Sequence, residues 1–236
     1  MQNKKICIIG NSVALRVRPT EKHPENKNYF QLLQDEVGNN DLFYNLACGA
    51  QTVKDIYKEI DNYIRIFPSY YIINLGVVDS STREVPLWFY RLSTKKSLNP
   101  FFVFWSLFYR SIIAKFRIVL VKLRGKTSWI SENKFENYFE LILQSLLKET
   151  NAKIIILSIN EANERIESQL PGSLKKHKAY NKIMNKLADK YNQDYLNTNK
   201  LIGLEDYPDG VHFSITGHKK IAKKLSSIIY SVKNNK

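Results

Sequence analysis

Short apolar runs alternate with segments of helical periodicity along most of the chain, and no other sequence feature limits the possible fold as strongly. The apolar runs predict five strands, near residues 4–10, 41–46, 70–75, 153–159 and 193–196. The other segments carry apolar residues at helical spacing and predict helices over 26–37, 51–67, 131–150, 174–191 and 215–232. Strands that alternate with helices of this length predict a parallel sheet covered by helices on both faces.

The alternation is interrupted between about residues 85 and 130 by a basic segment rich in aromatic residues. This segment holds nine Lys or Arg residues and no Asp or Glu, so it contributes +9 to a net charge of +14. The whole chain has 236 residues, 44% of them hydrophobic, which is enough for one sizeable core. We therefore expect a single domain over 1–236 with an inserted amphipathic segment at about 85–130.

The inserted segment also indicates which partners to expect. Basic residues concentrated in one apolar, aromatic segment favour an anionic lipid surface over nucleic acid, for which no motif is present. At steps of about 100° along a helix over 99–124, one face collects Phe101, Trp105, Tyr109, Ile112, Phe116, Val119, Leu120 and Leu123, with Lys and Arg at its edges. This pattern predicts an amphipathic helix on an anionic membrane surface. A lid, an extra core helix or an oligomer contact are the alternatives, and the oligomeric state is not indicated.

Cysteine use and the start of the chain bear on location. Cys7 and Cys48 lie in or beside predicted strands without metal-ligand spacing, so we interpret them as buried, reduced thiols. No apolar segment precedes the first strand, and no run of 18 uncharged apolar residues exists. These features predict a cytoplasmic protein without a signal peptide or spanning helix, with a peripheral position on the inner face of the membrane as the alternative. Neither a metal nor an organic cofactor is expected.

The sequence contains the three residue types of a nucleophilic triad at strand and helix ends. Ser12 follows the first strand, where ligands collect in an open parallel sheet. About 200 residues later, Asp209 and His212 stand three positions apart, just before the last predicted helix. A serine hydroxyl is a poor nucleophile unless a neighbouring imidazole takes its proton, and a carboxylate orients that imidazole. Of the other histidines, we expect His177 to be exposed and His218 to be structural or solvated.

Four short stretches, each at a predicted strand end or just before the last helix, resemble the SGNH hydrolase family, also called GDSL-type esterases. They are Gly10-Asn11-Ser12, Cys48-Gly49-Ala50, Gly76-Val77-Val78-Asp79 and Asp209-Gly210-Val211-His212. The resemblance covers most of the chain outside 85–130 and implies a flavodoxin-like three-layer α/β/α sandwich with a central parallel sheet. It also implies that Ser12 is the nucleophile, His212 the base and Asp209 the residue that orients the imidazole. The chain lacks the G-x-S-x-G elbow of α/β-hydrolases.

The family's oxyanion hole implies three hydrogen-bond donors, of which this chain keeps two. The backbone amides of Ser12 and Gly49 occupy two positions, but Val78 stands where the family has an asparagine side chain. In a well-studied protease the loss of one such donor costs about 10²–10³ in turnover. The residues that could supply the third donor are Asn74, Asn160 and Arg83.

The resemblance extends to a substrate class. Residues 76–83, followed by Pro86-Leu87-Trp88, look like a variant associated with SGNH proteins of surface-polysaccharide gene clusters, which would imply an acyl group on a sugar. The candidate substrate-binding residues are Arg16, Arg83, Asp79 and Asn11, the last standing in place of the family's aspartate. The arginines, with Arg18, could bind an anionic substrate or be solvated, and Asp79 could simply hold its loop together.

These observations favour a serine esterase that removes an O-acyl group, with acetyl favoured, from a carbohydrate or polysaccharide precursor. Two alternatives are open from the sequence. One is an acyltransferase that passes the acyl group to a sugar hydroxyl. The other is a catalytically degenerate SGNH fold that binds a glycan or lipid-linked precursor at the membrane surface.

Overall fold

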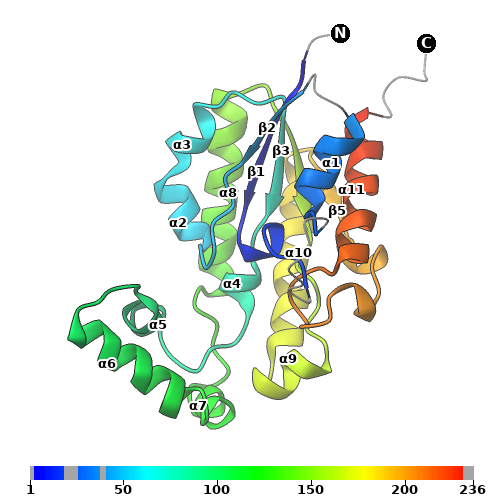
Figure 1. Ribbon diagram of the computed structural model, residues 1–236. Helices are drawn as coiled ribbons and strands as arrows, with labels where there is room; N and C mark the ends of the chain where they lie inside the picture. The colour runs from blue at the N-terminus through cyan, green and yellow to red at the C-terminus, as the bar shows by residue number, and fades with distance from the viewer. Residues whose placement is uncertain (1–2, 19–25, 38–40, 231–236) are drawn as a thin grey trace.

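A five-stranded parallel sheet forms the centre of the computed structural model, which describes residues 3–18, 26–37 and 41–230 (Figure 1). The strand order is β2-β1-β3-β4-β5, for β1 (Lys5–Gly10), β2 (Leu42–Asn45), β3 (Tyr70–Asn74), β4 (Lys153–Leu157) and β5 (Asp194–Leu196). Every pairing is parallel, with Gly10 of β1 opposite Asn74 of β3. β3 is buried along its whole length, as expected for a strand covered on both faces.

Helices cover both faces of the sheet and complete the three-layer α/β/α sandwich that the sequence predicts (Figure 1). One face carries α1 (Tyr29–Val37) and α11 (Ile215–Tyr230), which pack against each other. The other face carries α2 (Val53–Lys58), α3 (Ile60–Ile64) and α8 (Glu132–Glu149), with α10 (Ser173–Lys190) beside α8. The inner side of α11 is buried at helical spacing, at Gly217, His218, Ile221, Ala222, Leu225 and Ile229.

The helices lie close to their predicted bounds, except that the one predicted over 51–67 is divided into α2 and α3. The break is at Glu59, whose backbone angles (φ −110°, ψ 19°) are not helical. Both halves pack against α8, so their apolar spacing continues across the break. α2 begins after Thr52, which exchanges reciprocal side-chain and backbone hydrogen bonds with Asp55. This cap satisfies two backbone donors that would otherwise be unpaired at the start of the helix.

The carboxyl ends of the parallel strands meet at one edge of the sheet, at the bottom of Figure 1, and bring distant segments together. β1 leads into the 3-10 turn η1 (Ser12–Ala14), and the turn at 48–50 lies beside it because the Cys48 amide donates to the Gly10 carbonyl at 3.0 Å. The remaining short elements near this edge are α4 (Val77–Ser80), α9 (Glu164–Gln169), η3 (Thr198–Lys200) and η4 (Leu204–Asp206). The loop between η4 and α11 carries residues 207–214.

The basic insertion projects from this same edge, beside α4 (Figure 1). It consists of α5 (Leu87–Thr94), α6 (Pro100–Phe108), the π-helical turn η2 (Tyr109–Ile113) and α7 (Arg117–Leu123). The prediction of a single helix over 99–124 is therefore wrong. A π-helical turn and the non-helical residues 114–116 separate α6 from α7.

The buried carboxylate of Glu84 lies beside this interruption of the helix. Its Oε1 atom accepts hydrogen bonds from the Tyr109 hydroxyl and from Arg117 Nε. In a straight α-helix these two residues would lie about 12 Å apart along the axis. Side chains from both sides of the interruption reach the same oxygen atom. A carboxylate that is only 5% exposed needs such partners, because an unpaired buried charge is costly.

Gly76, between β3 and α4, provides a test of this packing. Its φ is +106°, and a Cβ atom added there would lie 2.7 Å from Ile159 Cδ1. We expect Gly76→Ala to lower the free energy of unfolding by about 2–4 kcal/mol, because backbone strain and overpacking act together. Gly125→Ala is the matched control, since Gly125 also has a positive φ (+66°) but nothing within 4 Å of its added Cβ. Urea unfolding midpoints that shift equally for both variants would contradict the packing argument.

Candidate active site

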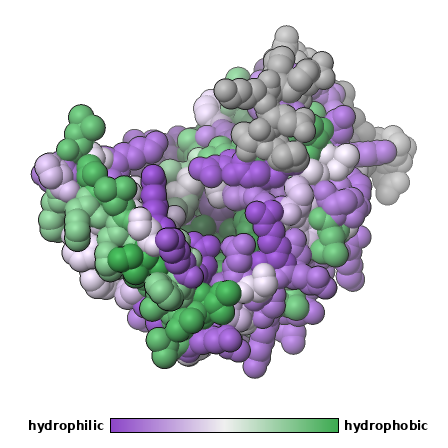
Figure 2. Space-filling model, turned by 60° about the horizontal axis from the view of Figure 1, so that its bottom comes forward, coloured by the Kyte–Doolittle hydropathy of each residue, from purple (hydrophilic) through white to green (hydrophobic). Residues whose placement is uncertain are grey.

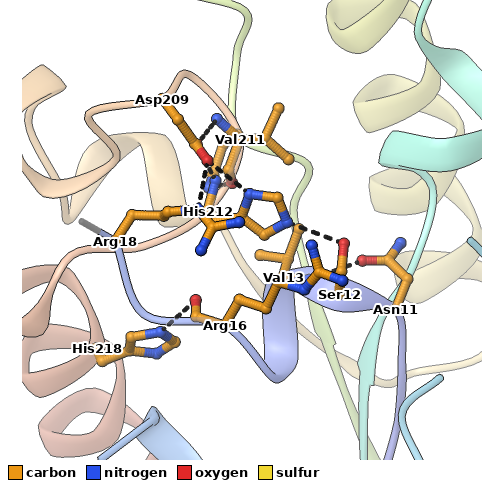
Figure 3. Close-up of polar contacts among 10 residues, drawn as sticks. Asn11, Ser12, Val13, Arg16, Arg18, Asp209, Val211, His212 and His218 are labelled. Carbon is orange, nitrogen blue, oxygen red and sulfur yellow. Dashed lines mark hydrogen bonds and ion pairs between the residues drawn. The ribbon is translucent and has the colours of Figure 1, made fainter. Parts of the chain in front are cut away.

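An unbroken chain of hydrogen bonds joins Ser12, His212 and Asp209 at the carboxyl end of β1 (Figure 3). The Ser12 Oγ atom lies 2.9 Å from His212 Nε2, and His212 Nδ1 lies 2.8 Å from Asp209 Oδ2. Ser12 and His212 are 200 positions apart in the sequence, and the parallel sheet brings them together. The structure therefore places the three predicted residues in the order that a nucleophilic triad requires.

The surroundings of Asp209 determine where the protons are. Burial would raise the pKa of Asp209, but hydrogen bonds from the side chain and backbone of His212 outweigh it and hold that pKa well below its usual range. An ionised carboxylate only accepts hydrogen bonds, so His212 Nδ1 must donate to it. His212 Nε2 is then left to accept the Ser12 hydroxyl proton. This tautomer is the one in which imidazole can act as a general base toward serine.

The loop that carries Asp209 and His212 is held in shape by its own hydrogen bonds. Asp209 Oδ1 accepts from the amides of Val211 and His212 at 2.9 and 2.7 Å. Gly210, which lies between Asp209 and Val211, has φ +81°, a left-handed conformation that other residues adopt only with strain. Asn160, after β4, donates its side-chain amide to the Val211 carbonyl at 2.9 Å. These contacts fix the imidazole relative to the sheet.

Asn11 fixes the serine side of the site. Its Oδ1 atom accepts a hydrogen bond from the Val13 amide at 3.1 Å and so caps η1, which begins with Ser12. The backbone amide of Asn11 donates a hydrogen bond to the backbone carbonyl of Asn74 in β3. Because Asn11 is completely buried, the prediction that it binds substrate is wrong. Its role here is to hold the turn that begins with Ser12.

Two of the three predicted oxyanion donors are available. In the described part of the chain, neither the Ser12 nor the Gly49 amide takes part in a backbone hydrogen bond. Gly49 is exposed, with no atom within 4 Å of where a Cβ would lie, so a carbonyl group can approach it. Its neighbour Cys48 is also exposed, which corrects the expectation of a buried thiol, whereas Cys7 is buried as expected.

The third donor position differs from the other two, because the residue that stands there has no side-chain donor. The Val78 side chain is 6% exposed and has no donor. Asn160 is engaged with Val211, and Arg83 donates to the Val78 carbonyl at 3.3 Å while its guanidinium stacks on Trp129. Of the three candidates, Asn74 alone has a side-chain amide without a hydrogen bond to a residue that the structure describes.

Two arginines follow Ser12 and have different surroundings (Figure 3). Arg18 donates from Nε to Asp209 Oδ2 at 3.1 Å and from its backbone to the Phe213 carbonyl at 2.8 Å. This contact with the triad carboxylate was not predicted, because it depends on a loop almost 200 positions away. Arg16 is exposed and directs its guanidinium group toward Ser12, without a hydrogen bond to any described side chain. Arg16 thus remains a candidate for binding an anionic group of a substrate.

His218 and His177 are both structural. His218 accepts a hydrogen bond from the Tyr29 amide at Nδ1 and donates from Nε2 to the Arg16 carbonyl, so it ties the segment after Ser12 to α1 and α11. His177 contacts Ser81 Oγ and the Asn160 carbonyl. Burial lowers the pKa of each to about 4, so both are neutral near pH 7. The prediction that His177 is exposed is wrong, because α10 places it against α4.

Asp79 also has a structural role. Asp79 is completely buried, and its Oδ1 atom accepts a hydrogen bond from the Val53 amide at the start of α2. Burial raises the pKa of Asp79 to about 8, against the opposing effect of that amide. Asp79 is therefore closed to a substrate, contrary to the expectation that it binds one, and its carboxyl group holds the start of α2. Across the described residues, no cluster of His, Cys, Asp or Glu could hold a metal ion.

Comparisons with known proteins agree with this architecture. No family profile and no curated protein sequence matches the chain. Among solved structures, it is similar to the lipase/acylhydrolase from Enterococcus faecalis, with 14% identity, a TM-score of 0.64 and coverage of 96% of this chain and 95% of that one. It is also similar to Axe2, an acetylxylan esterase from Geobacillus stearothermophilus, with 17% identity, a TM-score of 0.59 and coverage of 98% of this chain and 97% of that one. A third similar structure is that of a GDSL-like lipase from Parabacteroides merdae, with 16% identity, a TM-score of 0.62 and coverage of 98% of this chain and 97% of that one. At these identities the likeness shows a shared fold.

The protonation of Asp79 can be tested through stability. With its pKa raised from 3.8 to about 8, the folded protein keeps a proton that the unfolded chain releases between these values. Wild-type stability should therefore fall relative to Asp79→Asn as the pH rises from about 4 to 8, by at most about 1.4 kcal/mol per pH unit. Urea unfolding midpoints of both proteins at pH 5 and pH 8 measure this difference. A difference that does not change with pH would mean that Asp79 is ionised in the folded protein.

Proposed function

We propose that this chain, which has the SGNH hydrolase fold, is a serine esterase with Ser12 as nucleophile, His212 as general base and Asp209 as the residue that orients the imidazole. The observation that carries the proposal is the hydrogen-bonded sequence from Ser12 through His212 to Asp209, at the edge where ligands bind in parallel sheets. The free amides of Ser12 and Gly49 beside it supply an oxyanion site.

The chemistry follows from these positions. Ser12 Oγ attacks the ester carbonyl carbon while its proton passes to His212 Nε2, and Asp209 stabilises the imidazolium that forms. The negative charge on the former carbonyl oxygen is held by the Ser12 and Gly49 amides. The imidazolium then gives its proton to the leaving alkoxide, and an acyl-serine ester remains. Water, deprotonated by the same imidazole, attacks this ester and releases the acid and the free serine.

An O-acyl carbohydrate is the substrate class that we favour, with acetyl as the acyl group. Two observations support it. The stretch 76–88 resembles SGNH variants of surface-polysaccharide clusters. Axe2 and a second structurally similar protein, AlAXEase, are described as acetylxylan esterases. The exposed guanidinium of Arg16 near Ser12 favours a substrate that also carries a negative charge.

Val78 favours one other function, which is binding of the same glycan or lipid-linked precursor without turnover. An oxyanion hole short of one donor stabilises the transition state less, and the loss can be large. The intact hydrogen bonding of Ser12 to His212 favours the esterase, because a binding site has no need to activate a serine.

Covalent labelling tests whether Ser12 is activated. A fluorophosphonate probe should add to Ser12 of the wild type, and His212→Ala should lower both labelling and hydrolysis of p-nitrophenyl acetate by about 10³-fold or more. Ser12→Ala locates the adduct, and Ser214→Ala is the control for a nearby serine hydroxyl outside the triad. Intact-mass spectra that show no adduct on folded wild type, even at high probe concentration, would exclude the esterase and favour the binding function.

Replacing Val78 tests the missing donor. Val78→Asn restores the family's side-chain amide, so turnover of p-nitrophenyl acetate should rise, by up to about 10²-fold. Val78→Leu is the matched control, because leucine has nearly the shape of asparagine but no hydrogen-bond donor. A rate that rises in both variants would reflect packing, and a rate that rises in neither would mean that another group, such as the Asn74 amide, already fills the position.

A further inference from the structure

The helix α6 has an apolar surface that the rest of the described chain does not cover. Eight of its nine residues are apolar (Pro-Phe-Phe-Val-Phe-Trp-Ser-Leu-Phe), and none of the nine is buried. Phe101, Phe104 and Leu107 share one side at helical spacing and are 55%, 59% and 57% exposed. A helix on the surface of a globular protein normally turns a polar side to water, and α6 has none.

The apolar surface continues beyond α6. Within α6, Val103 is also exposed, and the exposed large hydrophobic side chains that flank or follow the helix are Leu98, Ile112, Phe116, Ile118, Val119 and Leu123. Leu98 is 98% exposed and Leu123 is 78% exposed, so the surface extends from the start of α6 to the end of α7. In Figure 2, hydrophobic side chains gather on the insertion side of the face that carries the strand ends. We call these ten residues the insertion surface.

Positive charge surrounds the insertion surface and is largely uncompensated. Of the nine basic residues between 85 and 130, Arg91 pairs with Asp55 and Arg117 with Glu84. The other seven have no ion pair with any residue that the structure describes: Lys95, Lys96, Arg110, Lys115, Lys122, Arg124 and Lys126. A partner for this segment must therefore provide both apolar contact and negative charge.

A cavity in the insertion adds a place for an anionic group. It has a volume of about 600 Å³ and opens between α5 and α6, next to Glu84. Lys95, Lys96, Arg110 and Arg117 line it, and the one carboxylate among its lining residues, Glu84, is already hydrogen-bonded to Tyr109 and Arg117. Basic side chains around such a hollow suit a phosphate head group.

We propose that the insertion surface docks on a lipid bilayer rich in anionic phospholipids. A bilayer interface supplies acyl chains for the apolar side chains and phosphates for the lysines and arginines beside them. Within 3–18, 26–37 and 41–230, no helix is long and apolar enough to cross a membrane, so α6 and α7 would lie in the interface plane. A second copy of the chain is a poorer partner, because it would bring the same seven unpaired cations against these.

The position of the insertion gives the docking a direction. It projects from the edge of the sheet where the strands end, which is also the edge that holds Ser12 and His212 (Figures 1 and 2). A protein docked through the insertion surface would therefore turn that edge toward the membrane. This docking does not depend on the proposed esterase activity and can be tested without it.

Flotation with vesicles tests the docking. The wild type should float with vesicles of phosphatidylcholine and phosphatidylglycerol in equal parts, and binding should weaken as salt rises. It should float poorly with phosphatidylcholine alone. The variant Phe101→Ser, Phe104→Ser, Leu107→Ser should lose most binding while keeping its fold, because these side chains are exposed. Hydrolysis of p-nitrophenyl acetate serves as the check on folding if the wild type is active, and circular dichroism serves if it is not.

Charge reversal tests whether membrane binding depends on the cations of the insertion or only on the net charge of the whole protein. The triple variant Arg110→Glu, Lys115→Glu, Lys122→Glu should weaken partitioning by about 10²-fold or more. The matched control reverses Lys219, Lys223 and Lys224, three exposed lysines of α11, and changes the net charge equally. An equal loss in both variants, or wild type that stays in the soluble fraction at low salt, would overturn the proposal. So would a wild-type dimer that the serine variant of α6 converts to a monomer, since the surface would then be an interface between copies.

Discussion

The parallel direction of all five strands is the constraint on which the rest of the structure depends. The buried apolar runs of β1, β3 and β4 can lie side by side only with helices covering both faces, and parallel pairing then puts every carboxyl end on one edge. That edge brings Ser12 within hydrogen-bond distance of His212 across 200 positions. The site is therefore a consequence of sheet direction. Hydrogen bonds within its loops, together with those from Asn160 and Arg18, set the final geometry.

Burial and hydrogen bonding sort the ionisable groups around this edge into different charge states. Asp209 receives hydrogen bonds from His212 and Val211 that favour its carboxylate, whereas Asp79 is fully buried with one amide donor and has a raised pKa. His218 is neutral because burial disfavours its charged form, and in that form it accepts from one amide and donates to one carbonyl. The Asp209 carboxylate is thus kept ionised, with Arg18 as an ion-pair partner, whereas burial keeps Asp79 and His218 in their neutral forms.

The insertion follows different rules from the sandwich. Polar contacts join it to the sandwich, among them Arg91 with Asp55 of α2 and Arg117 with Gln169 of α9. Within it, the Glu84 carboxylate accepts hydrogen bonds from Tyr109 and Arg117. Val121 is completely buried, but α6 contributes no buried residue. The segment is thus anchored at its base while its apolar surface remains exposed, which a segment selected only for packing would not require.

Local information in the sequence determined the strands and most helix bounds, because apolar spacing depends on neighbouring positions. The short stretches Gly10-Asn11-Ser12 and Asp209 to His212 were enough to predict which three residues lie together at the end of β1. Contacts between distant segments were decided only by the tertiary structure. They include the Arg18 bond to Asp209, the burial of Asn11 and Asp79, and the Glu84 carboxylate that accepts from residues on both sides of the α6–α7 interruption. No periodicity records them, since each depends on which side chain the fold places opposite another.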